Sequence, residues 1–280
     1  MTDLATELLD FLAIFVIALV PAVLYLVWIR GIERYRTIGW GPIVSAFAYG
    51  AVIATLVAAA IEALLVAGGT SLSQAIPGPA FSFLNGNSTA GTFFLILVIA
   101  PFVEEGLKAL GVVGQRARIQ ILADGPVFGA SVGLGFGFFE TALYAIVGFA
   151  VGGLPAAIAV ILVRSVSSVL LHASSTAMFG YGYAQSRVRG VPGASGRYYF
   201  VAVGMHATYN ALASLGVILL AFGVSNTIGA LAGDVALVAA IAFAVLAFQH
   251  IARLIRETDF PVLAGARQFQ PGTVRPRPPA

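Results

Sequence analysis

The chain has 280 residues, of which 59% are hydrophobic and only 10% are charged, and its mean hydropathy is +0.96. A soluble domain carries about 25% charged residues, so this composition leaves too little polar surface for a water-soluble globule. The net charge of +3 does not indicate a nucleic-acid-binding protein, because the basic residues fall in short clusters between apolar stretches. The absence of cysteine excludes disulfides and a thiolate metal site. The composition predicts an integral membrane protein.

Seven apolar stretches are long enough to cross a bilayer as helices. A hydrocarbon core of about 30 Å requires about 20 apolar residues in a helix. In chain order, the predicted spans cover residues 11–29, 40–67, 91–114, 125–150, 156–185, 198–222 and 230–252. The predicted fold class is therefore all-α, a polytopic transmembrane helix bundle. The segment 68–90 is rich in Gly, Ser, Pro and Asn and is expected to form an outer loop.

The basic residues are distributed unevenly between the segments that these spans connect. Thirteen of the fifteen Lys and Arg residues follow the first, third, fifth or last span, and the loops 68–90, 151–155 and 223–229 carry none. Because cytoplasmic loops are enriched in Lys and Arg, this pattern places the N-terminus outside and the C-terminus in the cytoplasm. We expect a multi-pass protein of the cell membrane.

The domain organisation is simple. Residues 1–263 are predicted to form a single transmembrane domain without a sequence repeat of fixed period. The segment 264–280 is polar and Pro-rich, a composition typical of disorder, and is expected to form a cytoplasmic tail.

A few polar side chains fall inside the predicted spans. Placing an ionisable residue there costs about 2.5–3.5 kcal/mol on insertion scales, so such residues indicate function by default. The set consists of Glu104, Glu105, Lys108, Glu140, Arg164, His172, His206 and Asn210. Their depths along the spans are compatible with one shared site in the inner half to middle of the bilayer.

Helical spacing relates several of these residues. Lys108 follows Glu104 by four residues and Glu105 by three, so it can reach either carboxylate. Glu104 and Glu105 point about 100° apart, so only one of them is expected to face the reacting water. His206 and Asn210 are four apart and share a helix face.

This combination of side chains suits hydrolysis of an amide bond. A buried Glu can serve as a general base, and His and Asn side chains can donate to an oxyanion. Two His and one Glu are also a common zinc ligand set, although the HExxH motif of soluble zinc proteases is absent. Neither a GxSxG motif nor a Ser–His pair indicates a serine nucleophile.

The order of these residues resembles the PrsW-type intramembrane protease family, which is related to the type II CAAX prenyl endopeptidases and the bacterial immunity-type membrane proteases. The EExxK motif stands at 104–108, the FxxxE motif at 136–140 and the HxxxN motif at 206–210, with the isolated His172 between them. In the CAAX endopeptidases the second motif ends in His, whereas this chain has Glu140, which favours the PrsW branch.

The resemblance implies an intramembrane endopeptidase that cleaves a membrane protein substrate. A glutamate of the first motif would activate the water, and we expect this to be Glu105, with Glu104 held by Lys108. His172, His206 and Asn210 would bind a metal or the oxyanion. Arg164 would act as a supporting counter-charge.

The cofactor is left open by the sequence. If a metal such as zinc is bound, the expected ligands are Glu140, His172 and His206, and a metal-free glutamate mechanism is the alternative.

Two other functions also account for the intramembrane polar residues. Intramembrane Glu and His side chains form proton relays in carriers, and the Gly-rich segment 132–137 is compatible with a broken helix. A proton-coupled membrane transporter is therefore the alternative function, and a non-catalytic scaffold is a third.

Overall fold

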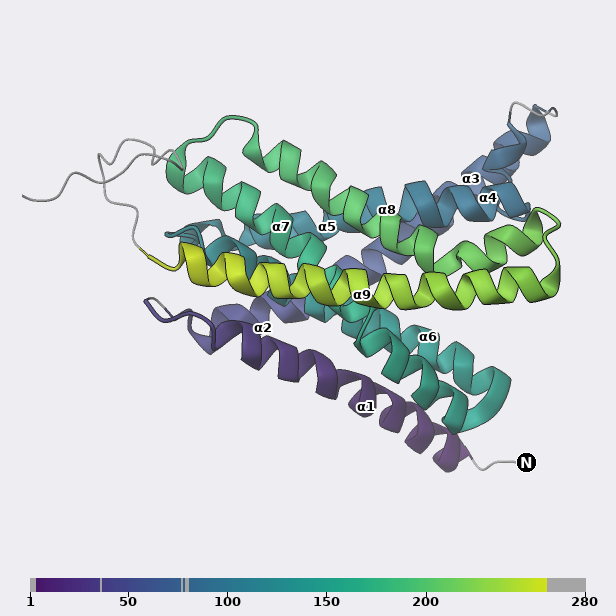
Figure 1. Ribbon diagram of the computed structural model, residues 1–280, viewed down its shortest axis with the longest axis horizontal. Coiled ribbons are helices and arrows are strands. Elements are labelled where there is room, and N and C mark those ends of the chain that lie inside the picture. Colours follow the sequence, from purple (N-terminus) through teal and green to yellow (C-terminus); the bar gives the residue numbers. More distant parts are fainter. Residues whose placement is uncertain (1–3, 36, 77, 79–80, 261–280) are drawn as a thin grey trace, which may run out of the picture.

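The computed structural model describes residues 4–35, 37–76, 78 and 81–260, and within them it contains helices and no strands (Figure 1). The helices, in chain order, are α1 (Leu4–Arg30), α2 (Trp40–Ala48), α3 (Thr55–Ala75), α4 (Thr89–Phe94), α5 (Ala100–Gly114), α6 (Asp124–Ser165), α7 (Ser168–Arg189), α8 (Ala194–Ala221) and α9 (Asn226–Thr258). Short π-helical segments, η1 (Tyr49–Ala54) and η3 (Leu95–Ile99), join α2 to α3 and α4 to α5. The all-α prediction is confirmed, and the tail 264–280 lies outside the described residues.

Five helical stretches of the described chain are long and apolar enough to cross a membrane. They cover Leu8–Arg30, Trp40–Ala75, Asp124–Arg189, Ala194–Ala221 and Asn226–Thr258. The third stretch is 66 residues long and contains two predicted spans, 125–150 and 156–185. The predicted span 91–114 is helical but is not among the five. The structure therefore supports a multi-pass protein without confirming the count of seven.

Two predicted boundaries differ from the structure. Helix α3 extends to Ala75, so the first part of the expected loop 68–90 is helical. The predicted span 156–185 is interrupted at Val166 and Ser167, which separate α6 from α7. Within α6, Gly152 and Gly153 leave helical geometry, and Gly153 has a φ of 66°. A residue with a side chain is strained at such a φ, so this glycine permits the chain to reverse direction.

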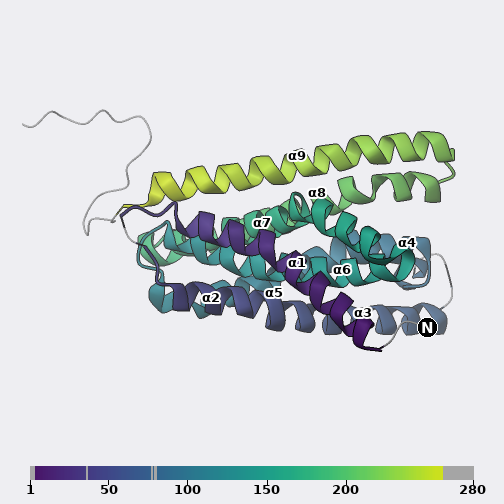
Figure 2. The ribbon, with the colours of Figure 1, turned by 90° about the horizontal axis from the view of Figure 1, so that it is seen from below.

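The helices run lengthwise through the molecule, and their connections gather at its two ends (Figure 2). The connections between α1 and α2 and between α7 and α8 lie at the same end as the end of α9, on the left in Figure 1. The Asp259 carboxylate accepts a hydrogen bond of 2.8 Å from the backbone N–H of Tyr35, which fixes two of these segments together. The turn between α8 and α9 lies at the opposite end. The Arg-rich connections after the first and fifth predicted spans thus share one end.

The first half of α6 forms the centre of the bundle, and residues 124–138 are all buried. Glycines on one face of this helix allow α7 to approach closely. A Cβ atom added at Gly129 would lie 2.3 Å from the carbonyl oxygen of Thr176, and one at Gly133 would lie 2.1 Å from that of His172. Both distances are far below van der Waals contact, so only glycine fits there. This packing places the polar face of α7 against α6.

The π-helical segment before α5 contains a backbone carbonyl that has no hydrogen-bond donor within its own helix. In the π segment η3 the N–H of Ala100 donates to the carbonyl of Leu95, five residues earlier. The next carbonyl, that of Ile96, would pair with the nitrogen of Pro101, which carries no hydrogen. The side-chain amide of Asn210 donates to the Ile96 oxygen instead, at 2.8 Å. This bond ties α8 to the start of α5.

Candidate functional site

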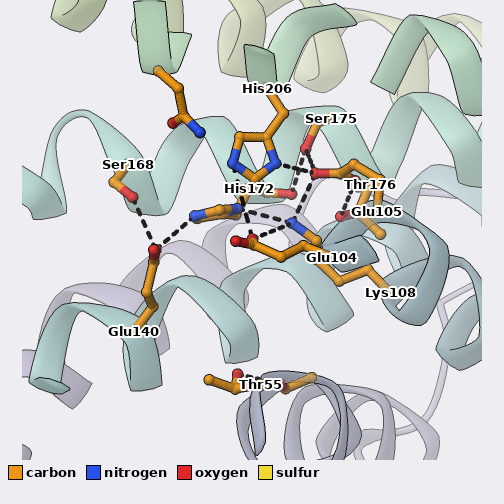
Figure 3. Close-up of polar contacts among 12 residues, drawn as sticks. Thr55, Glu104, Glu105, Lys108, Glu140, Ser168, His172, Ser175, Thr176 and His206 are labelled. Carbon is orange, nitrogen blue, oxygen red and sulfur yellow. Dashed lines mark hydrogen bonds and ion pairs between the residues drawn. The ribbon is translucent and has the colours of Figure 1, made fainter. Parts of the chain in front are cut away.

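Seven of the eight predicted polar residues, all except Asn210, converge from α5, α6, α7 and α8 on one buried cluster, most of which Figure 3 shows. Glu105 lies near its centre. One carboxylate oxygen, Oε1, accepts hydrogen bonds from Lys108 at 2.7 Å and from Ser175 at 2.9 Å, and it lies 3.0 Å from Nδ1 of His206. The other oxygen accepts from Thr176 at 3.3 Å. The carboxylate of Glu105 is therefore fully hydrogen-bonded.

Lys108 is fully buried, with 0% of its surface exposed. Its Nζ lies 2.7 Å from Glu105, 3.6 Å from Oε2 of Glu104 and 2.9 Å from Nδ1 of His172. It also lies 4.3 Å from the centre of the Phe136 ring, whose face attracts a cation. The shorter ion pair is with Glu105, whereas we expected Lys108 to hold Glu104. A buried charge is tolerated only when it is paired, and these contacts satisfy that demand.

Glu140 and Arg164 form the most accessible part of the cluster, with side-chain exposures of 20% and 17%. Nη2 of Arg164 donates to Oε2 of Glu140 at 2.6 Å and to Ser168 at 2.8 Å. The same Glu140 oxygen lies 2.8 Å from Nε2 of His172. Arg164 thus forms an ion pair with Glu140, and its supporting role in catalysis stays a prediction.

The partners of the two imidazoles define which nitrogen carries the proton. An ammonium group only donates, so with Lys108 charged, Nδ1 of His172 accepts and Nε2–H donates to Glu140. For His206, a carboxylate only accepts, so Nδ1–H donates to Glu105. Nε2 of His206 then keeps a free lone pair. The two rings lie nearly perpendicular, with their centres 4.9 Å apart.

Glu104 differs from Glu105 in having a buried oxygen that is free of hydrogen bonds among the described residues. This atom, Oε2, lies 3.9 Å from Nε2 of His206. One ligand atom from each of Glu104, His172 and His206 can be chosen so that all lie within 4.8 Å of one another. This group contains both predicted histidine ligands, with Glu104 in the place that we expected Glu140 to take.

The donor set suits a divalent metal such as zinc in its chemistry. A carboxylate oxygen that accepts no hydrogen bond among the described residues faces an imidazole nitrogen whose ring is oriented by a second carboxylate, and metal-binding histidines are commonly held in this way. His172 has both ring nitrogens in contact with protein groups, so it would offer Nδ1 only after Lys108 moves. The residues present therefore fit a metal, with that one adjustment.

Comparison with protein families assigns the chain. The PrsW family of intramembrane metalloproteases matches residues 39–248, most of the sequence. This chain belongs to the PrsW family. No curated protein and no solved structure matches it. The assignment makes it a hydrolase, an intramembrane protease with several membrane-spanning helices, and the predicted resemblance to this family is confirmed. Its wider relationship to the CAAX endopeptidases stays a prediction.

The structure does not favour the alternative reading of this PrsW-family chain as a carrier. The Gly-rich segment 132–137 is continuous helix, and its glycines serve close packing on two sides. A Cβ at Gly135 would lie 2.0 Å from the carbonyl oxygen of Phe47, just as one at Gly133 would clash with α7.

Asn210 is the predicted site residue whose contact lies away from the cluster. Its described hydrogen bond is to the Ile96 carbonyl before α5. Three hydroxyl groups of α7 that were not predicted from the sequence also belong to the cluster; those of Ser168, Ser175 and Thr176 donate to Glu140 or Glu105. Ser175 and Thr176 follow His172 by three and four residues, a spacing that predicts one shared helix face.

Proposed function

We propose that this PrsW-family protein hydrolyses a peptide bond of a membrane protein substrate, and that Glu104 lies at the reaction centre. The proposal rests on Oε2 of Glu104, which accepts no hydrogen bond among the described residues and lies 3.9 Å from Nε2 of His206. A reacting carboxylate oxygen needs an unused lone pair. Both oxygens of Glu105 already have partners, because they accept from Lys108, Ser175 and Thr176 and one of them also faces His206.

We assign Glu104, His172 and His206 as the residues that hold the metal of this metalloprotease. When bound, the ion supplies Lewis-acid polarisation of the peptide carbonyl. Glu105 orients His206 through its Nδ1–H, and Glu140 orients His172 through its Nε2–H. Both carboxylates thereby fix the directions in which the imidazole lone pairs point. A metal-free mechanism would use the same Glu104 oxygen as the general base.

The substrate is assigned to the side where Glu140 and Arg164 reach the surface. These two residues are the exposed edge of an otherwise buried cluster. A peptide segment that approaches from this edge meets Glu140 and Arg164 before it meets the histidines. The polar edge also offers partners to backbone groups of an unwound substrate segment, which cannot remain unpaired in lipid.

Seven membrane crossings with the N-terminus outside complete the proposal. The span 91–114 is the sixth helical stretch, and the break at Gly152 and Gly153 divides the 66-residue stretch into two crossings. The lack of native cysteine allows a direct test with single-cysteine variants. A membrane-impermeant maleimide should label Ser225→Cys from the outside and Arg189→Cys only after the membrane is opened. The reverse pattern would invert the topology.

The function itself is tested by cleavage of single-span substrates with the purified, full-length protein. We expect cleavage by the wild type and a loss of at least about 100-fold in Glu104→Gln. Asp234→Asn is the matched control, because Asp234 is an exposed carboxylate within a candidate span on α9, a helix that contributes no residue to the cluster. Full activity in Glu104→Gln would overturn the assignment.

A further inference from the structure

A cavity of about 330 Å³ opens at the Arg-rich end of the bundle, away from the buried cluster. It is lined by Trp28, Gly31, Ile32, Arg34 and Arg256. Two guanidinium-bearing residues from segments far apart in sequence thus share one cavity with an aromatic ring and an aliphatic side chain. This combination offers positive charge next to an apolar wall.

The two arginines have different surroundings from their neighbours. Arg30, one turn before Arg34, is already engaged, because its Nε donates to the carbonyl of Ile38 at 2.8 Å and its guanidinium lies 4.4 Å from the Trp40 ring centre. Among the described residues, the side chains of Arg34 and Arg256 form no ion pair. Nε of Arg256 donates to Ala252 of its own helix at 3.1 Å, which leaves its terminal nitrogens available.

A contact between the segment after α1 and the end of α9 stabilises the shape of the cavity. The Asp259 carboxylate accepts the backbone N–H groups of Arg34 and Tyr35, so the segment after α1 is fixed to the end of α9. This bonding also occupies the Asp259 oxygen that faces the segment. Asp259 and Glu257 do not line the cavity, so its lining contains two cations and no anion.

We propose that this cavity binds the phosphodiester headgroup of an anionic phospholipid. Arg34 and Arg256 contact the phosphate oxygens, for which planar guanidinium groups are well suited. Trp28 and Ile32 contact the start of the acyl chains, where aromatic residues commonly lie at the edge of the bilayer. Basic residues at this level are attracted to anionic lipids, and a cavity between two helices adds a defined binding site to that attraction.

The test is native mass spectrometry of the full-length protein in detergent, titrated with phosphatidylglycerol or phosphatidylcholine. We expect a preference for phosphatidylglycerol, and a loss of about fivefold in its affinity for each of Arg34→Gln and Arg256→Gln. The matched controls are Arg187→Gln and Arg253→Gln, each of which removes the same single charge from an exposed arginine at the same end that does not line the cavity. Both control variants should keep the preference for phosphatidylglycerol.

Three results would overturn the proposal. They are equal affinity for the two lipids, equal losses in the control and cavity variants, and complete displacement of the lipid by millimolar inorganic phosphate. The last would identify the ligand as a free phosphate rather than a lipid headgroup. Because binding is read directly, the outcome does not depend on whether the protein cleaves any peptide.

Discussion

The Glu105 carboxylate accepts the Nδ1–H of His206 at 3.0 Å, and this bond turns the other nitrogen of the ring toward Glu104. Two adjacent glutamates thus have different surroundings. Glu105 is enclosed by α7 and α8 and accepts a hydrogen bond from Lys108, whereas Oε2 of Glu104 lies 3.6 Å from Lys108 and accepts no hydrogen bond among the described residues. Because neighbouring residues of a helix point about 100° apart, they contact different partners.

We predict that Glu105→Gln weakens metal binding without removing a ligand. Loss of a partner that orients a metal-binding histidine typically lowers metal affinity by about 10–100-fold. His206→Ala should lower the metal affinity further, because it removes a proposed ligand. Zinc titration of the purified protein, with metal content measured after dialysis, gives the order of affinities. Metal binding that is equal in wild type and His206→Ala would exclude His206 as a ligand.

We predict that Lys108→Met destabilises the folded protein mainly through the loss of charge, because Met is close to Lys in volume. The variant leaves Glu104 and Glu105 buried without their common cation, and breaking a buried ion pair costs about 3–5 kcal/mol. The double variant Lys108→Met with Glu105→Gln should regain part of this loss, because it also removes a buried charge. Thermal unfolding in detergent measures both. A loss of stability in the double variant equal to the sum of the losses in the two single variants would argue against direct coupling of Lys108 and Glu105.

We predict that Gly133→Ala separates α6 from α7 and lowers both stability and activity. The added Cβ would lie 2.1 Å from the His172 carbonyl oxygen, and overpacking of this kind costs about 1–3 kcal/mol. Gly204→Ala on α8 is the control, since a Cβ there meets nothing within 4 Å. The unfolding temperature and the rate of substrate cleavage should fall in the first variant alone. Unchanged behaviour of Gly133→Ala would show that the helices are not in contact there.

We predict that Asn210→Ala destabilises the protein by leaving the Ile96 carbonyl without a partner. Hydrogen bonds between membrane helices contribute about 0.6–1.7 kcal/mol, so a small fall in unfolding temperature is expected. Pro101→Ala restores an N–H at the position that the π turn would use, and should recover stability in the double variant. Recovery of activity together with stability would assign Asn210 a positioning role. If stability recovers while activity stays absent, Asn210 would instead contact the substrate.

Much of the site was predictable from the residues that stand inside apolar stretches. Because charged groups are costly in lipid, the sequence alone predicts a functional role for five residues: Glu104, Glu105, Lys108, Glu140 and Arg164. The structure brings these five together with the two histidines. The contribution of the α7 hydroxyl groups was missed, because serine and threonine are unremarkable in membrane helices.

The sequence by itself determined the membrane-embedded helical class of this protein and the identity of its polar cluster, since composition and apolar length depend on local chemistry alone. The tertiary structure decided which partner each polar group takes. Lys108 can reach either glutamate along its helix, and only the approach of α7 and α8 fixes its shorter contact with Glu105. Asn210 shares a helix face with His206, yet it bonds a carbonyl freed by a proline 109 residues earlier in the chain, at Pro101. Such pairings depend on distances between helices, which glycine contacts set and no local pattern encodes.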